Sequence, residues 1–426
     1  MGPDLIVLIV AACLAGSLIG TFTGLVPGIH VNTLASLMLV SYPAMESFIS
    51  SFAPLSSVPI IVSSCIMSAS VVHSFVDFVP SVFIGAPDPD EVLTALPGHR
   101  LLMAGQGMRA VRSAAVGSAV GASSALLLAI PVQFLMLHGL AERVDIFTTA
   151  VLIFTLSAMI LKESGLRNKV WAAVLVAVSG MLGLACMDLP IPSAGIFGDG
   201  TLLFPMLTGL FGIPALLSSF GNPSVPEQVD EGIPPVDHIP GIKGALMGSV
   251  AGWYPGITAT AGASLSSIFM PEDKPERFIS LVASVGTVTS IFSLVTLSVS
   301  GSGRSGTVLV IRDILGDSAS GFCSPEFLLL LLSCTVASFL GYHITIAAGK
   351  MMSSMTGRIN TVLLNRGVLC LIVVLVLILT GPFGLVVLIV SALIGLIPQD
   401  VGVGRIPLSG CLMFPVIFHA LFGHFL

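Results

Sequence analysis

Two copies of a glycine-spaced Pro-Gly motif are the residues whose types and spacing could best form a binding site. In each copy three glycines stand four residues apart and are followed by Pro-Gly-Ile: Gly16, Gly20, Gly24 and Pro27-Gly28-Ile29, then Gly244, Gly248, Gly252 and Pro255-Gly256-Ile257. Glycines at this spacing line one helix face and allow a second helix to approach backbone to backbone. Proline removes an amide donor and glycine accepts unusual dihedral angles, so each helix should break at the Pro-Gly pair.

The residues just after each predicted break could supply hydrogen-bond donors to a ligand. These residues are His30, Asn32 and Thr33 in the first copy, and Thr258 and Thr260 in the second. Unwound backbone and helix N-terminal dipoles at such breaks attract anions, and two matching breaks indicate the substrate site of a transporter. The alternative is a simple kink that packs two helices, but the in-register recurrence favours a binding site formed by Pro27, Gly28, Pro255, Gly256 and these side chains.

His73 and Asp77 form the second candidate group. They lie four residues apart, hence on one helix face, inside the apolar run 58–84. A charged group there is costly unless it is paired or hydrated, so it is a functional candidate. We expect the pair to handle a coupling proton or cation; the alternatives are a structural hydrogen-bonded pair, or a surface position for Asp77. The corresponding residues of the second copy are Thr289 and Ser293, so the ionisable pair is unique to the first half.

Composition defines the class of protein that must position these residues. The chain has 426 residues, a mean hydropathy of +1.05 and only 9% charged residues, whereas a soluble domain carries about 25%. It is therefore expected to be an all-α polytopic protein whose main partner is the lipid bilayer. The net charge of −6 and the absence of a basic patch argue against nucleic-acid binding. The seven cysteines have no metal-ligand spacing, and we expect no metal and no cofactor.

Twelve apolar runs predict about 11 to 12 transmembrane helices in two repeats. The runs are 4–26, 58–84, 113–138, 146–161, 169–187, 201–220, 244–270, 278–299, 327–348, 366–380, 383–397 and 407–424. The motifs repeat at a spacing of 228 residues (255 − 27), and the segments after them, beginning at Ser74 and Ser290, at 216 (290 − 74). We expect a first repeat at 1–160, linking helices at 161–240, and a second repeat with C-terminal helices at 241–426.

The positive-inside rule favours an inverted second repeat. Phe204-Pro205 and Gly212-Ile213-Pro214 should interrupt the run 201–220, which could then be a re-entrant hairpin. In that arrangement twelve of the 16 Lys and Arg residues fall on the cytoplasmic side, against nine if every run crosses. Basic residues prefer the cytoplasmic side, so we predict about eleven crossings and one re-entrant segment.

Other motifs carry less weight. The segment Gly301–Gly306 matches G-x-G-x-x-G, but a dinucleotide site requires a βαβ unit that is not predicted here. No zinc, Walker or Ser/His/Asp pattern is present, so we assign no catalytic residue and expect no enzyme.

The first 120 residues resemble the TctA-like family, the integral permeases of tripartite tricarboxylate transporters. The resemblance rests on the glycine and Pro-Gly motif, and on Gly85-Ala-Pro87, Thr94-Ala95, Pro97-Gly98, Met103–Gly107 and Gly117–Gly121. The chain departs from the family where Val72–Asp77 replaces a Gly-Gly-Ser run and Asp88 replaces a glycine. The resemblance implies a short, divergent member, a secondary transporter with a paired-break site. It leaves open the solute and the presence of a solute-binding protein or small membrane subunit.

We therefore predict a multi-pass plasma-membrane permease for a small, carboxylate-type anion, coupled to H⁺ or Na⁺. The alternative is a translocase for a lipid-linked phosphate, because such proteins also use repeated Pro-Gly breaks.

Overall fold

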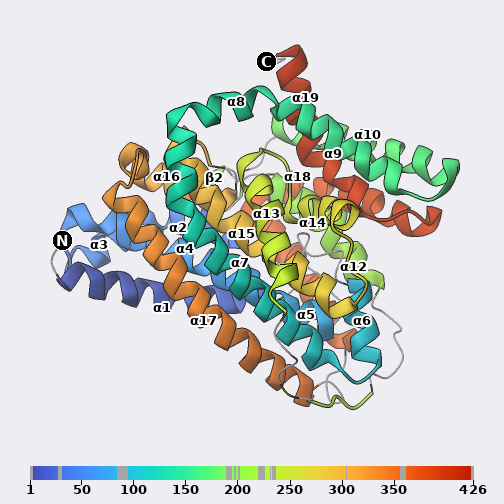
Figure 1. Cartoon of the computed structure of the whole chain (residues 1–426), viewed down its shortest axis with the longest axis horizontal. Helices are drawn as coiled ribbons and strands as arrows, with labels where there is room; N and C mark the ends of the chain where they lie inside the picture. Colours follow the sequence, from blue (N-terminus) through green and yellow to red (C-terminus); the bar gives the residue numbers. More distant parts are fainter. Residues whose placement is uncertain are drawn as a thin grey trace.

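The computed structural model is a bundle of helices (Figure 1). It describes residues 3–26, 31–83, 95–188, 194–195, 198–199, 202–218, 226–230, 232, 237–303, 305–355 and 361–423. The first part contains α1 (Pro3–Leu25), α2 (Val31–Val40), α3 (Tyr42–Ile49), α4 (Val58–Val76), α5 (Phe78–Phe83), α6 (Ala95–Met103) and α7 (Gly107–Leu135). The middle part contains α8 (Ala141–Ile146), α9 (Thr148–Lys162), α10 (Gly165–Asp188), α11 (Leu203–Leu207) and α12 (Ile213–Ser218). The last part contains α13 (Ile239–Trp253), α14 (Ala259–Phe269), α15 (Pro275–Ser300), α16 (Gly306–Leu315), α17 (Pro325–Met355), α18 (Thr361–Val401) and α19 (Gly410–Phe422).

The protein is an all-α polytopic membrane protein, as predicted. In the described residues, 7 helices are long and apolar enough to cross a membrane, and three shorter apolar helices accompany them. The described strands, β1 (Ala194–Gly195) and β2 (Gly198–Asp199), have two residues each and pair antiparallel. The predicted runs 366–380 and 383–397 are the two arms of α18, which kinks at Gly381 with φ 69°.

The segment 201–220 differs from the prediction. Residues 203–218 form one short helical rod, α11 to α12, with a π-turn at Thr208–Gly212 instead of a hairpin reversal. Pro205 stands in the first turn, where its missing amide costs little. Pro214 lies just after the π-turn. The wider turn leaves room for the proline ring, which has no amide to donate to the preceding turn. The two prolines are therefore absorbed without reversing the chain.

The glycine ridges make the same helix contacts in both halves. Gly16, Gly20 and Gly24 of α1 lie against α4. A Cβ atom at each would press in turn on the backbone oxygen of Cys65, Ala69 or His73. Along α13, Gly244, Gly248 and Gly252 lie in the same way against α15, at Leu281, Val285 and Thr289. The glycines of α13 stand 228 residues after those of α1, and their contact residues in α15 stand 216 residues after those in α4. The contacts therefore follow both spacings found in the sequence. In each half the two helices run parallel.

Contacts between the halves fix their relative direction. The helices α7 and α15 run parallel, because Gly117 lies against Ser280 and Gln133 donates to Ser298 Oγ at 2.9 Å. The helices α7 and α17 run antiparallel: Gln133 Oε1 accepts from the amide of Cys323, just before α17, while Gly349 lies against Val111.

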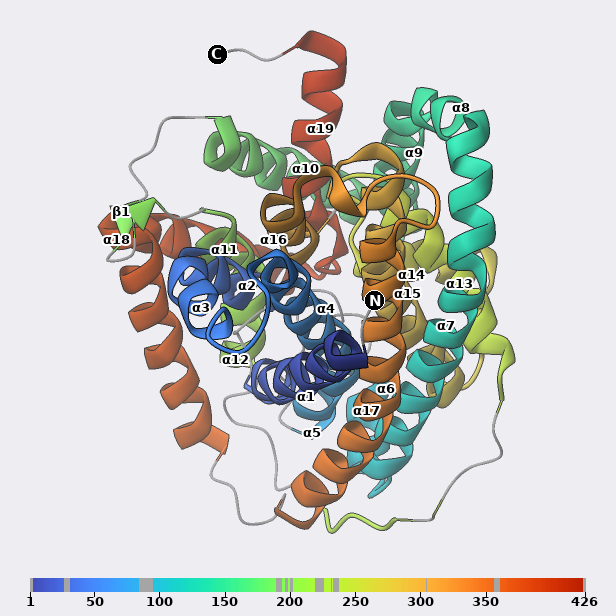
Figure 2. The same cartoon turned by 90° about the vertical axis from the view of Figure 1, so that its left-hand side faces the viewer.

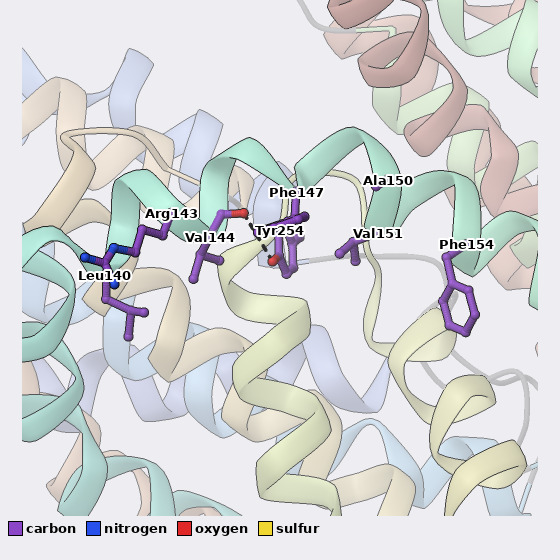
Figure 3. Close-up of a pocket in the computed structure, with 8 residues that line it drawn as sticks. All are labelled: Leu140, Arg143, Val144, Phe147, Ala150, Val151, Phe154 and Tyr254. Carbon is purple, nitrogen blue, oxygen red and sulfur yellow. Dashed lines mark hydrogen bonds between the residues drawn. The ribbon is translucent and has the colours of Figure 1, made fainter.

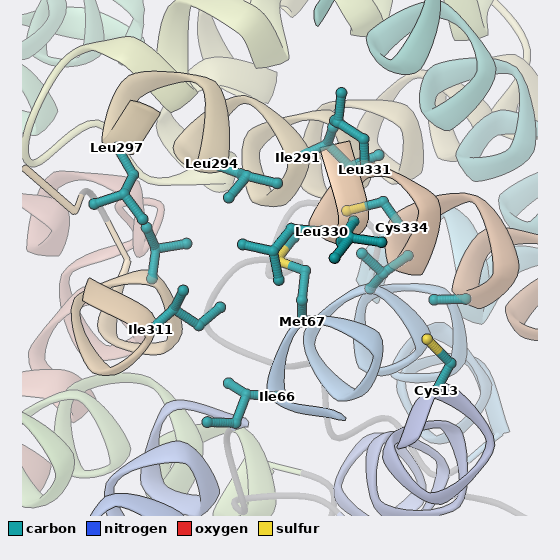
Figure 4. Packing of buried hydrophobic residues seen from close by; sticks show 14 of the residues in the cluster. Cys13, Ile66, Met67, Ile291, Leu294, Leu297, Ile311, Leu330, Leu331 and Cys334 are labelled. Carbon is teal, nitrogen blue, oxygen red and sulfur yellow. The ribbon is translucent and has the colours of Figure 1, made fainter. Parts of the chain in front are cut away.

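The helix α4 runs parallel to α17. Met67 packs beside Leu330 and Cys334 in the core (Figure 4), and Phe75 lies farther along, against Gly341. It follows that α1, α4 and α17 point one way, whereas α7, α13 and α15 point the other way. Each half therefore runs opposite to its counterpart, as in an inverted repeat.

The core of the molecule lies where the two halves interlock. Its largest cluster of buried side chains comes mainly from α1, α4, α15, α16 and α17, with three alanines of α7 (Figure 4). Contacts cross between the halves: α7 packs on α15 and α17 packs on α4, and α7 and α17 lie side by side (Figure 2). Each half therefore buries apolar surface of the other.

Close approach at the glycine ridges predicts a test of the fold. A Gly20→Ala or Gly248→Ala change should lower stability by about 1–3 kcal/mol, because the added methyl group meets backbone or a β-carbon and overpacks the contact. The measurement is the temperature at which half of the purified protein loses monodispersity on size-exclusion chromatography.

Gly367→Ala is the matched control, because a Cβ there has nothing within 4 Å. It should leave that temperature unchanged or slightly raised, since alanine favours the helix. Equal behaviour of all three variants would contradict the assigned contacts.

Candidate functional site

The segment of the first predicted break lies between α1 and α2. The helix α1 ends at Leu25 and α2 begins at Val31. Pro27, Gly28 and His30 lie outside the described residues, as does the side chain of Thr33. Asn32, in the first turn of α2, is described, and its contacts give the best view of the region beyond the break.

Asn32 joins the start of α2 to the start of α16. Its Oδ1 atom accepts a hydrogen bond from the amide of Thr307 at 2.9 Å. Gly306 is required for this approach, because a Cβ there would stand 2.8 Å from Asn32 Cγ. Ser305 caps α16 by accepting from the amide of Val308 at 3.3 Å. The N-terminal turns of two helices from different halves therefore meet, and both helix dipoles present their positive ends here.

Hydroxyl groups extend this junction toward α4. Thr307 Oγ1 lies 3.4 Å from Ser70 Oγ and 3.0 Å from Ser305 Oγ. Ser70 is buried at the middle of α4. The junction thus combines hydroxyls and one carboxamide, which are neutral groups able to donate to an anion, with two backbone amides that already donate to Asn32 and Ser305.

His73 and Asp77 follow Ser70 on the same face of α4, at successive turns. Both are buried, with 3% and 5% of their surface exposed, so the surface position considered for Asp77 is wrong. His73 Nδ1 lies 2.9 Å from Thr23 Oγ1. The Thr23 hydroxyl also lies within hydrogen-bonding distance of Gly20 O, at 3.2 Å.

Asp77 caps the C-terminus of α4, and its amide donates to His73 O at 3.0 Å. Gly24 of α1 packs against this amide and against His73 O. The predicted pair therefore sits against the last turns of α1, immediately before the first Pro-Gly sequence. Packing of the glycine ridge places the ionisable pair against the end of α1.

The corresponding side chains of the second half donate hydrogen bonds to backbone carbonyls of their own helix. Thr289 Oγ1 donates to Val285 O at 2.7 Å, and Ser293 Oγ to Thr289 O at 2.8 Å. Such bonds to the preceding turn satisfy a hydroxyl locally. The ionisable pair is thus a property of the first half, as the sequence indicates.

The second break is well defined. The helix α13 ends at Trp253, Gly256 adopts φ 79°, and Thr258 caps α14 by accepting from the amide of Ala261 at 3.1 Å. Pro255 lies between these ends, and Thr260 is buried. Left-handed φ explains the glycine, because other residues resist this conformation.

The neighbours of the second break come from the middle and C-terminal helices. Gly256 packs against Leu412 and Met413 of α19. Trp253 Nε1 donates to Asp145 Oδ1 at 3.1 Å, and Tyr254 donates to Val144 O at 3.3 Å. Asn32, by contrast, contacts α16. That the two breaks share one hollow stays a prediction.

Sequence reasoning missed the role of Ser70, Thr23 and the 305–307 segment. The G-x-G-x-x-G match at Gly301–Gly306 is the entry to α16, and its last glycine makes room for Asn32. One signal could have found it: the 216-residue spacing aligns this segment with the polar loop that begins at Gly85. Among the described residues, no group of three His, Cys, Asp or Glu side chains could hold a metal ion.

An inverted-repeat bundle with interrupted helices and a buried ionisable pair defines a membrane protein of the transporter class. The sequence model of the tripartite tricarboxylate transporter TctA family matches residues 10–410. This chain belongs to the TctA family, and the resemblance found in its first 120 residues is thereby confirmed.

Among curated proteins, the chain is similar to a protein of Methanocaldococcus jannaschii described as uncharacterized, 26% identical over 424 residues, covering 96% of this chain and 98% of the relative. No solved structure matches the chain. Family membership makes the chain a multi-pass permease component of a tricarboxylate transporter, with a solute-binding protein and a small membrane subunit as the implied partners. It does not favour the lipid-phosphate translocase considered above.

Proposed function

We propose that this permease binds a small carboxylate-type anion at the junction of α2 and α16, beside the first Pro-Gly sequence. The observation that carries the proposal is the hydrogen bond between Asn32 Oδ1 and the amide of Thr307. It brings two helix N-termini together inside the bundle, where their amides and dipoles favour negative charge. Pro27, Gly28, His30 and Thr33 belong to the same proposal through their position in the chain.

Neutral donors suit a transport site. The junction offers Asn32, Ser70 and Thr307 without a Lys or Arg among them. A carboxylate can accept several hydrogen bonds from such groups. Charge-assisted hydrogen bonds would bind the anion more tightly. A transporter must also release its solute, so such tight binding is not required.

The second break enters the proposal as the counterpart of the first. Thr260 corresponds to Asn32 by the 228-residue spacing and is likewise near the start of a helix, α14. Inverted repeats commonly exchange roles when a carrier changes the side to which it opens. We assign Pro255, Gly256, Thr258 and Thr260 to the solute path on this basis.

His73 and Asp77 are proposed to bind the coupling ion, H⁺ or Na⁺. They are buried one and two turns beyond Ser70, whose hydroxyl reaches the junction. An ion bound to Asp77 would lower the cost of placing an anion nearby. This linkage would make the solute and the ion favour each other's binding. We place the protein in the plasma membrane, where such ion gradients exist.

The anion site is tested by two substitutions at one position. Asn32→Asp keeps an acceptor for the amide of Thr307 but adds a negative charge, whereas Asn32→Ala removes the acceptor. Thermal unfolding of the purified protein is followed with citrate, succinate and phosphate. In the unsubstituted protein a carboxylate should stabilise by about 2.7 kcal/mol at a hundredfold excess over Kd. Both variants should lose this shift, and Asn32→Asp should retain its ligand-free stability.

Asn168→Ala is the control, because Asn168 is a half-buried asparagine of α10 whose side-chain amide donates to Gly402 O at 3.4 Å. It should respond to the solute as the unsubstituted protein does. A full shift in Asn32→Asp would contradict the site. The lack of a shift with every carboxylate in the unsubstituted protein would contradict the proposed solute class.

Coupling is tested by Asp77→Asn. The solute-induced thermal shift of the unsubstituted protein should depend on Na⁺ concentration or on pH, since coupled ligands raise each other's affinity. Asp77→Asn should still show a solute-induced thermal shift, but that shift should no longer depend on Na⁺ concentration or pH. Ser293→Ala, the corresponding position of the second half, should keep the dependence. Unchanged dependence in Asp77→Asn would assign coupling to other residues.

A further inference from the structure

A pocket of about 520 Å³ lies between the start of α9, the helix α8 and the end of α13. Its lining is almost entirely apolar or aromatic, and Figure 3 shows the side chains involved: Leu140, Arg143, Val144, Phe147, Ala150, Val151, Phe154 and Tyr254. We call it the α8–α9 groove. It lies apart from the junction of α2 and α16, since none of its residues belongs to those helices.

The groove is continuous with the lipid-facing surface. The side chains of Phe147 and Phe154 are 59% and 53% exposed. Leu135, in the last turn of α7, is also an exposed apolar residue. A π-turn at Met136–Leu140 redirects the chain into α8, which lies across the end of α7 (Figures 1 and 2). A short helix lying across the end of a spanning helix is expected near the membrane interface. The groove therefore opens where lipid headgroups meet acyl chains.

Arg143 gives the groove its charge. Its side chain is exposed at the rim, and within the part of the chain that the structure describes it makes no ion pair. The nearby carboxylate of Asp145 accepts from Trp253 instead. A guanidinium above an apolar floor matches a molecule with an anionic head and a long apolar tail. Arginine binds phosphate oxygens in a bidentate manner.

We propose that the α8–α9 groove binds one phospholipid with an anionic headgroup. The headgroup phosphate pairs with Arg143, and one acyl chain lies along Phe147, Val151 and Phe154. The bound lipid also contacts Tyr254, which directly precedes Pro255 and Gly256. The lipid thereby braces the end of α13 at the second break, and its presence stabilises that break. This proposal concerns a lipid ligand and is independent of the solute site.

Native mass spectrometry of the purified permease tests the proposal. The protein is delipidated and titrated with phosphatidylglycerol or with phosphatidylcholine of the same acyl chains. One phosphatidylglycerol should bind in preference to phosphatidylcholine. Arg143→Gln should bind phosphatidylglycerol about tenfold more weakly, the loss expected for one charge-assisted contact. Val151→Trp fills the groove without changing its charge and should reduce binding of both lipids.

Arg167→Gln is the matched control, because Arg167 is also an exposed arginine at the start of a helix, α10, and does not line the groove. It should bind phosphatidylglycerol as the unsubstituted protein does. Circular dichroism and size-exclusion profiles establish that each variant is folded. Equal affinity for the two lipids, or equal losses in Arg143→Gln and Arg167→Gln, would overturn the proposal.

Discussion

Backbone-to-backbone contact between helices, made possible by glycine at every fourth position, is the constraint on which the structure depends. It sets α1 against α4 and α13 against α15 at matching residues. A side chain in either ridge would separate the helices, because the positions of the missing Cβ atoms are taken by backbone and β-carbons of the partner helix. The same contact brings Thr23 to His73. Helix packing and the position of the ionisable pair therefore have one origin.

The proposed site depends on how the two halves interlock. Because they run in opposite directions, the entry to α16 in the second half reaches the start of α2 in the first, and Asn32 meets Thr307. Ser70 then links this junction to the face of α4 that carries His73 and Asp77. Polar groups that would be costly in a membrane are thus gathered in protein-lined space, as interrupted helices require. This arrangement is the physical basis for assigning solute and ion to neighbouring positions.

Much of this could be predicted from sequence, because it follows from local periodicity. Glycine spacing, the two Pro-Gly sequences and the 216-residue offset indicated the repeat. The distribution of Lys and Arg indicated its inversion only through a hairpin at 201–220, which the structure does not form. The contact of Asn32 with Thr307 could not be predicted, since it joins residues 275 positions apart through packing of whole helices. The packing of Gly256 on α19 was missed for the same reason. In 201–220, proline pattern alone predicted a reversal, whereas a π-turn absorbs Pro214.

The central claim is that a solute anion binds where α2 and α16 meet. Cryo-electron microscopy of the permease with saturating citrate tests it most directly. The account predicts ligand density within hydrogen-bonding distance, about 3 Å, of Asn32 and of the first amides of α16. Density confined to another part of the molecule, with the junction of Asn32 and Thr307 closed and empty, would contradict it.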